Sequence, residues 1–229
     1  MRNQLKSHGY LYGIGLGVNT EIYKGFSTRK RLIPVLGYKG ERLSVYGPFI
    51  SYKLFNFDSI DVLIKASPRF QGFEPSDSEI FAGMKKRHFS MDAGVGVNYH
   101  NSDWKISFSA MFDAFDRSNG RELTSSIGKA FKFGPLFFEP SISVSYLDAN
   151  HVDYYYGVHI SEINDNRIAY KGSSVVNYGV GMSFATPIFF DGFSRLSMSH
   201  TWFDHNIANS PLVDKDTNLS LNFIFTKFF

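Results

Sequence analysis

Apolar and polar residues alternate with a period of two along most of the 229-residue chain. In the last run, Leu219, Leu221, Phe223, Phe225 and Phe229 share one face, and Asn and Ser side chains occupy the other. Such alternation is typical of a β-strand with one apolar and one polar face. Similar runs have about 10 residues, the length with which a tilted strand crosses the hydrocarbon layer. They cover residues 10–19, 89–99, 104–113, 136–146 and 176–184.

The polar faces of these runs are rich in Gly and Ser and carry few charges. The outer face of a soluble β-sandwich favours Lys, Glu and Thr, whereas small side chains suit the crowded, hydrated interior of a barrel. Aromatic residues such as Tyr10, Trp104 and Trp202 stand near the ends of runs, as in the aromatic belts of membrane proteins. The pattern therefore predicts an all-β, transmembrane, antiparallel up-and-down β-barrel that covers residues 10–229 as a single domain.

The links between the runs differ in length, as the topology of an outer-membrane barrel requires. Short links are predicted to be periplasmic turns, and long links are predicted to be extracellular loops. The short links are 38–41, 57–59, 100–103, 133–135 and 190–192. The long links are 19–28, 71–87, 115–121, 147–173 and 205–216.

The number of strands depends on Gly47-Pro48, where the alternation changes phase. A plain count gives eleven strands, but a barrel with both ends of the chain in the periplasm needs an even number. Gly-Pro is either a bulge within one strand or a turn between two strands. A turn gives twelve strands, one of them short, and we prefer this count; ten is the alternative, if the first run packs elsewhere.

Composition excludes several classes of protein. The mean hydropathy is −0.16 although 17% of residues are aromatic, and no run approaches the ~20 apolar residues of a spanning helix. The absence of cysteine excludes disulfides and thiolate metal sites, the histidines lack metal-ligand spacing, and no cofactor is expected. The net charge of +3 is scattered and predicts no nucleic-acid binding. Residues 1–9 contain no apolar signal core, so we expect a periplasmic N-terminal segment of a chain whose signal peptide has been removed.

The final strand ends in Phe229 and resembles the closing strand of bacterial outer-membrane barrels. In that resemblance the terminal Phe is the signal that the barrel-assembly machinery reads. Lys227 departs from the pattern, in which the third residue from the end is usually apolar.

Four segments resemble the MipA/OmpV family of outer-membrane proteins: 13–18, 32–35, 154–158 and 209–213. Their order and spacing match from Tyr10 to Phe229. The most specific positions are Tyr155, Tyr156, Gly157, Val158, Ser210, Pro211, Leu212 and Val213. The resemblance implies a location in the outer membrane of a Gram-negative bacterium, in contact with lipid and lipopolysaccharide. It also implies a non-enzymatic scaffold that links a lytic transglycosylase to a peptidoglycan synthase, and we expect a monomer.

A second hypothesis is a narrow, porin-like channel for small polar solutes. Charged residues on the polar faces would then line the lumen and set its selectivity. They are Asp61, Lys65, Arg69, Asp92, Lys105, Asp113 and Glu139. The alternative is that acids and bases pair and fill the lumen, since unpaired charges are unfavourable in a low-dielectric interior. We favour a plugged or very narrow lumen.

A third hypothesis is an acyl-transfer enzyme at the end of the barrel. His200, Asp204, His205 and Ser210 are close in sequence, and nucleophilic catalysis needs a hydroxyl, a base and an orienting group. In a continuous strand His200 and Asp204 would share a face. Polar loop residues at the headgroup level are the more common explanation, so no catalytic residue is assigned. The aromatic link 147–173 is a candidate recognition surface or lumen constriction, or it extends strands beyond the membrane. As family-signature residues, its Tyr and Val positions are expected rather to stabilise the loop.

Overall fold

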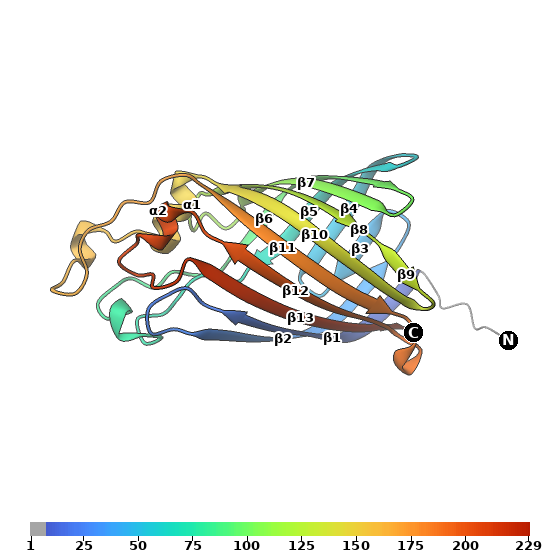
Figure 1. The fold of residues 1–229 in the computed structure, drawn as a ribbon, viewed down its shortest axis with the longest axis horizontal. Helices are drawn as coiled ribbons and strands as arrows, with labels where there is room; N and C mark the ends of the chain where they lie inside the picture. The colour runs from blue at the N-terminus through green and yellow to red at the C-terminus, as the bar shows by residue number, and fades with distance from the viewer. Residues whose placement is uncertain (1–7) are drawn as a thin grey trace.

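A computed structural model describes residues 8–229 of the protein. Its strands pair antiparallel with their neighbours, and the pairing of β1 with β13 closes them into a twelve-stranded barrel (Figure 1). The strands are β1 (Gly9–Thr20), β2 (Thr28–Lys39), β3 (Leu43–Tyr46), β4 (Phe49–Phe57), β5 (Ile60–Arg69), β6 (Ser90–Asn101), β7 (Trp104–Asp113), β8 (Arg121–Lys129), β9 (Phe131–Phe133), β10 (Leu136–Leu147), β11 (Val175–Thr186), β12 (Phe193–Trp202) and β13 (Thr217–Phe228).

The predicted count of twelve is confirmed, and the alternative of ten is wrong because β1 lies between β2 and β13. Gly47-Pro48 is a turn between β3 and β4, with Gly47 at a φ of 57°, a conformation that glycine adopts readily. The short β9 continues the line of β8, since both pair with β10. Residues 1–7 of the expected N-terminal segment lie outside the described part of the chain.

Strand register places apolar and polar side chains on opposite faces of the wall. Leu16 on β1 pairs with Leu32 on β2 and with Phe223 on β13, and all three belong to the apolar face. On the other face, Gly17 pairs with Arg31 and Asn222. Apolar side chains such as Ile142 on β10, which is 59% exposed, point outward, as expected of a surface that meets lipid. The exterior is therefore the apolar face, and the polar face surrounds the lumen.

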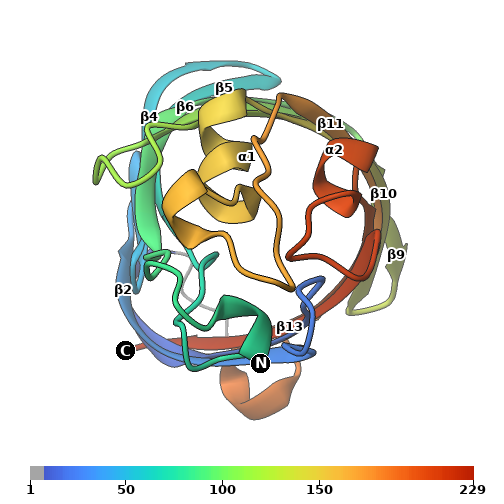
Figure 2. The same ribbon diagram turned by 90° about the vertical axis from the view of Figure 1, so that its left-hand side faces the viewer.

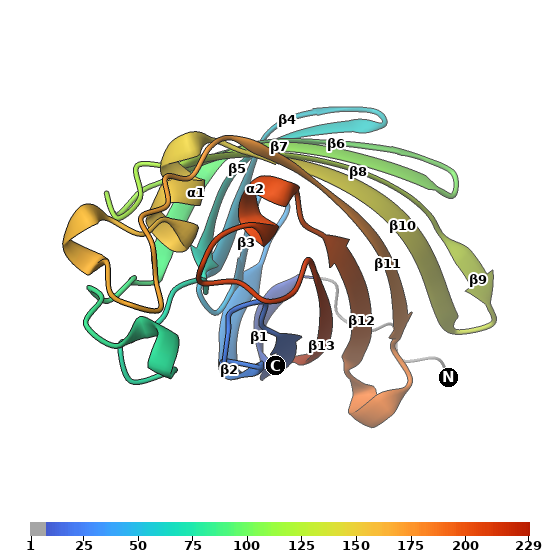
Figure 3. The same cartoon turned by 60° about the vertical axis from the view of Figure 1, so that its left-hand side comes forward.

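The two ends of the barrel differ. Short turns, Asp58-Ser59 and Ser102-Asp103 among them, connect the strands at one end, which we call the turn end. The opposite loop end carries the links 21–27, 70–89, 148–174 and 203–216 with their helices (Figures 1 and 3). The helices are η1 (Glu79–Phe81), α1 (Ala149–Tyr156), η2 (Ile160–Glu162) and α2 (His205–Ala208), and η3 (Phe189–Asp191) lies at the turn end. None of the helices within residues 8–229 has the length and apolar character to span a membrane.

Candidate functional site

The polar face of the wall encloses cavities inside the barrel. One cavity of about 470 Å³ is bordered by Asp61 on β5, Lys105 on β7, Glu139 on β10 and Arg195 on β12. Since β5 and β12 belong to different sides of the closed barrel, these side chains meet only across the lumen. The register places all seven charged residues proposed for the lumen on this same face: Asp61, Lys65, Arg69, Asp92, Lys105, Asp113 and Glu139.

Most of these seven residues form ion pairs with charged residues on other strands. Lys105 pairs with Glu139, and Asp61 accepts from Lys53 at 3.0 Å. Arg69 pairs with Asp92 and, at 2.6 Å, with Glu122 on β8. Lys53, Glu122, Arg31 and Arg195 also face the lumen, and the sequence hypothesis omitted them although they occupy the polar faces of their strands.

Asp113 has a different role from the other lumen candidates. It stands at the loop end of β7, where its carboxylate accepts from the backbone N–H groups of Phe115 at 3.1 Å and Ser118 at 2.5 Å. The carboxylate thus holds the turn between β7 and β8. Lys65 lies over Gly96 on β6, where a Cβ would be 2.9 Å from the lysine Cδ, so the glycine makes room for this side chain.

A hydrophobic core lies at the loop end of the barrel. The links 21–27, 70–89, 148–174 and 203–216 together form what we call the cap, which covers the barrel mouth in Figure 2. The links 70–89, 148–174 and 203–216 contribute fully buried side chains, namely Phe81, Val152, Tyr155, Ile207 and Leu212. The link 21–27 contributes Tyr23, which is 2% exposed. The long loops therefore pack as one folded unit with a core of their own.

The two family-signature segments meet in this cap. The Ser210 hydroxyl donates to the carbonyl of Tyr156 at 2.6 Å, and the Tyr23 hydroxyl donates to the carbonyl of Tyr155 at 3.0 Å. Tyr155, Tyr156, Val158, Leu212 and Val213 all belong to the buried core. The signature residues hold the loops to one another, and no solvent-facing surface is built from their apolar side chains.

An ion pair is buried among the cap residues. Arg87 binds both carboxylate oxygens of Glu162, at 2.9 and 2.7 Å, and these two residues are 4% and 3% exposed. Glu162 also accepts from the N–H groups of Lys85 and His159. Although burial opposes ionisation, these hydrogen bonds and the Arg87 charge lower the pKa of Glu162 to about 2. Arg167 is buried beside them and donates to the carbonyls of Glu162, Ile80 and Ala82.

Burial of His151 is expected to make the cap sensitive to mild acid. Its ring is 2% exposed and lies 3.1 Å from Gln71, and burial holds its pKa well below the usual range. The unfolded cap therefore binds a proton below pH ~6.5 that the folded cap excludes. The contribution of neutral His151 to cap stability is therefore fully present above this pH and is lost as the pH falls below it.

Replacing His151 with glutamine is therefore expected to remove part of the cap's acid sensitivity below about pH 6.5. Protease cleavage within residues 148–174, measured against pH, tests this. His205, whose side chain is 76% exposed, provides the control variant H205Q. An unchanged pH profile in H151Q would contradict the assignment.

The residues of the enzyme hypothesis do not converge. His200 faces lipid, paired with Leu219 and with its ring 4.5 Å from that of Trp202, while Ser210 is buried and bound to Tyr156. The expectation that Asp204 continues the strand of His200 is wrong. Strand β12 ends at Trp202, and the Asp204 carboxylate caps α2 by accepting from the Asn206 N–H. Polar groups released at a strand end are commonly used in this way.

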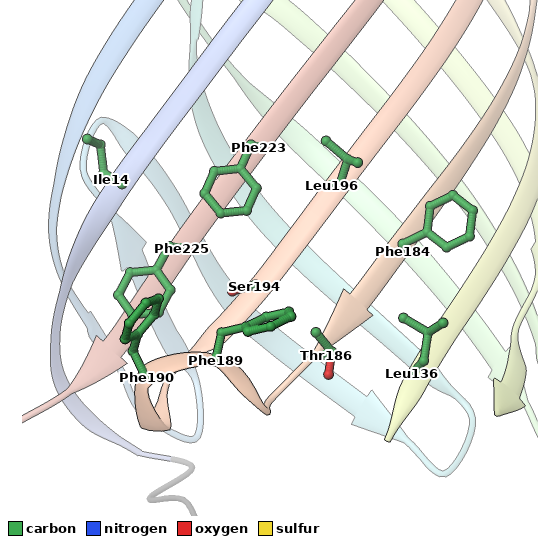
Figure 4. Close-up of a pocket in the computed structure, with 10 residues that line it drawn as sticks. All are labelled: Ile14, Leu136, Phe184, Thr186, Phe189, Phe190, Ser194, Leu196, Phe223 and Phe225. Carbon is green, nitrogen blue, oxygen red and sulfur yellow. The ribbon is translucent and has the colours of Figure 1, made fainter. Parts of the chain in front are cut away.

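A further cavity, of about 690 Å³, lies on the outer wall near the turn end (Figure 4). Its lining is almost wholly apolar, and Phe190 from η3 packs edge-on to Phe225 with ring centroids 6.2 Å apart. An apolar groove on this face is consistent with the lipid-facing exterior of an outer-membrane barrel. Phe229 follows β13 at this end, 70% exposed, with its ring 5.0 Å from that of Tyr12.

The family of the chain follows from comparison with known proteins. A family model described as "MltA-interacting protein MipA" matches residues 12–229. The chain belongs to this family. The "Putative outer membrane protein YiaT" of Escherichia coli K12 is 28% identical over 91% of this chain and 86% of its own. The "MltA-interacting protein" of the same strain is 24% identical over 89% of this chain and 83% of its own.

Among solved structures, a "Bacterial polysaccharide outer membrane secretin" has a TM-score of 0.48 at 10% identity, over 98% of this chain and 100% of its own. This likeness is too low to bear on function. The family and its outer-membrane relatives, together with the closed barrel, place the MipA-family protein in the bacterial outer membrane. The loop end is accordingly extracellular and the turn end periplasmic.

Proposed function

We propose that this MipA-family protein is a non-conducting, non-enzymatic anchor in the outer membrane that binds peptidoglycan-remodelling enzymes at its turn end. The cap carries the proposal. The folded core of the cap, with Phe81, Tyr155 and Ile207 at 0% exposure, lies over the extracellular mouth. The lumen cavities lie on the periplasmic side of this core. A barrel closed on that side is suited to holding a partner in the periplasm rather than to exchange of solutes.

The name of one relative supports the choice of partner. The family model and the Escherichia coli relative carry the words "MltA-interacting protein", and the notion of an adaptor comes to this chain from them. We propose a lytic transglycosylase as the partner, and a peptidoglycan synthase as a second one. The turns are short, so a partner would have to contact several turns at once or bind weakly.

Changing the turn between β6 and β7 tests this. Asn101→Ala, Ser102→Gly and Asp103→Ala together are expected to reduce co-purification of a lytic transglycosylase several-fold, because a small interface depends on each turn. The matched control changes Asp165 and Asn166, which belong to an exposed bend of the cap. Equal capture by both variants and the parent protein would contradict binding at the turn end.

A narrow channel is the second candidate, and the cavities below the cap favour it. Besides the cavity of about 470 Å³, two further cavities of about 310 and 290 Å³ lie nearer the cap, with Arg31 bordering both. If the cap opens, the charged lumen residues would set the selectivity. Steps of current in a planar bilayer, with an ion preference that changes in Lys65→Glu or Glu139→Lys, would favour the channel. A silent bilayer with folded protein would favour the anchor.

A further inference from the structure

The barrel wall has an incomplete seam between β2 and β5. The β3–β4 hairpin fills the space between these strands only near the turn end, and β2 pairs with β3 through Gly37, Tyr38 and Lys39 alone. Beyond the hairpin tip, no pairing or loop hydrogen bond among residues 8–229 reaches the second backbone edge of β2 between Thr28 and Val35. The wall is therefore open over the loop-side part of β2.

Prolines border this opening on both sides. The Gly47 N–H donates to the carbonyl of Leu36 at 3.1 Å, so the backbone groups of Leu36 point away from β1. Backbone groups along a strand point alternately to its two edges, so those of Pro34 point to the same, open edge. At the start of β5, the His100 N–H on β6 donates to the carbonyl of Ser59, so odd-numbered residues of β5 direct their backbone groups to β6. Even-numbered residues, Pro68 among them, direct theirs away from β6 and toward the opening. Proline has no N–H to leave unpaired and occurs in sheets at edges. Both strands are thus built as edges here.

The opening lies at the level of lipid. Leu32 and Leu36 on the outer face of β2 are 66% and 71% exposed, against 45% for Leu16 on the neighbouring β1. Unpaired backbone at this depth is tolerated only where it is buried or lines a cavity. A cavity of about 310 Å³ lies behind the opening, within the size range of ligand sites of ~300–1,000 Å³.

The cavity has an apolar side and a basic side. Phe49 and Phe70, whose ring centroids are 6.4 Å apart, lie at the opening together with Ile33. Arg31 and Arg195 border the same cavity, and neither forms an ion pair with a carboxylate within the described part of the chain. The guanidinium of Arg31 instead lies 5.0 Å from the centre of the Phe70 ring.

We propose that this cavity binds a single-chain anionic amphiphile, such as a fatty acid, which enters from the membrane through the opening between β2 and β5. The acyl chain lies between Phe49 and Phe70, and the anionic head group binds Arg31 and Arg195. The apolar mouth at lipid level selects the chain, and the two arginines without carboxylate partners select the charge. This site is independent of the proposed anchor function at the turn end.

Quenching of a tryptophan at the opening tests the proposal. Phe70→Trp in a Trp104→Phe, Trp202→Phe background is titrated in neutral detergent at pH 8 with 9,10-dibromostearate or its uncharged methyl ester. We expect saturable quenching, with the carboxylate bound at least ~10-fold more tightly than the ester, as for a charge-assisted contact. Arg31→Gln is expected to abolish this preference.

Two control variants separate the site from general partitioning. Ile142→Trp, on the lipid face of β10, reports quenching by probe dissolved in the surrounding detergent. Its quenching should rise without saturation. Lys30→Gln removes an equal charge from the outer face of β2 and should keep the preference for the carboxylate. Linear quenching in the Phe70→Trp variant, or an unchanged preference in Arg31→Gln, would overturn the proposal. If Arg31→Gln fails to give the heat-modifiable mobility of a folded barrel, Arg195→Gln takes its place.

Discussion

Replacing Arg87 with methionine is expected to open the cap while leaving the barrel wall folded. The substitution leaves the Glu162 carboxylate buried without its counter-charge, which is unfavourable by about 3–5 kcal/mol. Both partners belong to the cap links, so this loss falls on the cap. Protease cleavage within 148–174 should rise strongly, and current should appear in a planar bilayer if the cap is what closes the lumen.

The double variant Arg87→Met, Glu162→Leu is the control for this experiment. Replacing both charges with apolar side chains of similar size removes the unpaired group, and exchanges of this kind are often neutral. The double variant should therefore resist protease better than Arg87→Met alone. Equal sensitivity of the two variants would mean that the cap depends on the Arg87 hydrogen bond to the Tyr154 carbonyl rather than on charge balance.

Replacing Gly13 with alanine is expected to prevent stable closure of the barrel. A Cβ at Gly13 would lie 1.9 Å from the carbonyl oxygen of Phe225 on β13, so the backbone of the closing pair would have to move. Overpacking usually costs about 1–3 kcal/mol when side chains can adjust, and a backbone contact should exceed that range. The yield of protein with heat-modifiable gel mobility and its urea midpoint measure the effect.

Gly15 offers a matched control on the same strand and the same face. A Cβ there meets nothing closer than Ile33 at 3.6 Å, which is ordinary contact. Gly15→Ala should therefore fold in a yield similar to that of the parent protein. If both alanine variants fold equally well, close approach of β1 and β13 is not what requires glycine at position 13.

The alternation of residues was sufficient to predict the barrel because each strand carries its own apolar face. The phase change at Gly47-Pro48 and the need for an even count together indicated twelve strands, and the structure confirms that number. The turn at Gly47-Pro48 also indicated that one strand would be short, and β3 has only four residues. The pattern does not show, however, how much of the neighbouring β2 such a short strand leaves without a partner. The opening beside Pro34 and Pro68 was missed for this reason.

The cap was beyond prediction from the sequence for a different reason. Tyr155 and Tyr156 were noted as an aromatic cluster, but whether they lie on a surface or in a core depends on partners such as Tyr23 and Leu212 from distant links. Asp204 was placed in a strand because period-two arguments cannot detect where a strand gives way to a helix cap. Arg31 and Arg195 could have been found on the polar faces of their strands, had every lumen charge been considered.

The short contact between β2 and β3 also makes the barrel mechanically uneven. Chain closure between β1 and β13 extends over the nine residue pairs from Leu11 to Asn19, but the β2–β3 contact has only three pairs. Thermal fluctuations should therefore separate β2 from β3 first, on either side of the turn between residues 39 and 43. The pairing of β1 with β13, which joins the two ends of the chain, should stay intact. The hairpin of β1 and β2 would then move together with β11, β12 and β13 as one sheet. Amide exchange would be fastest along β3.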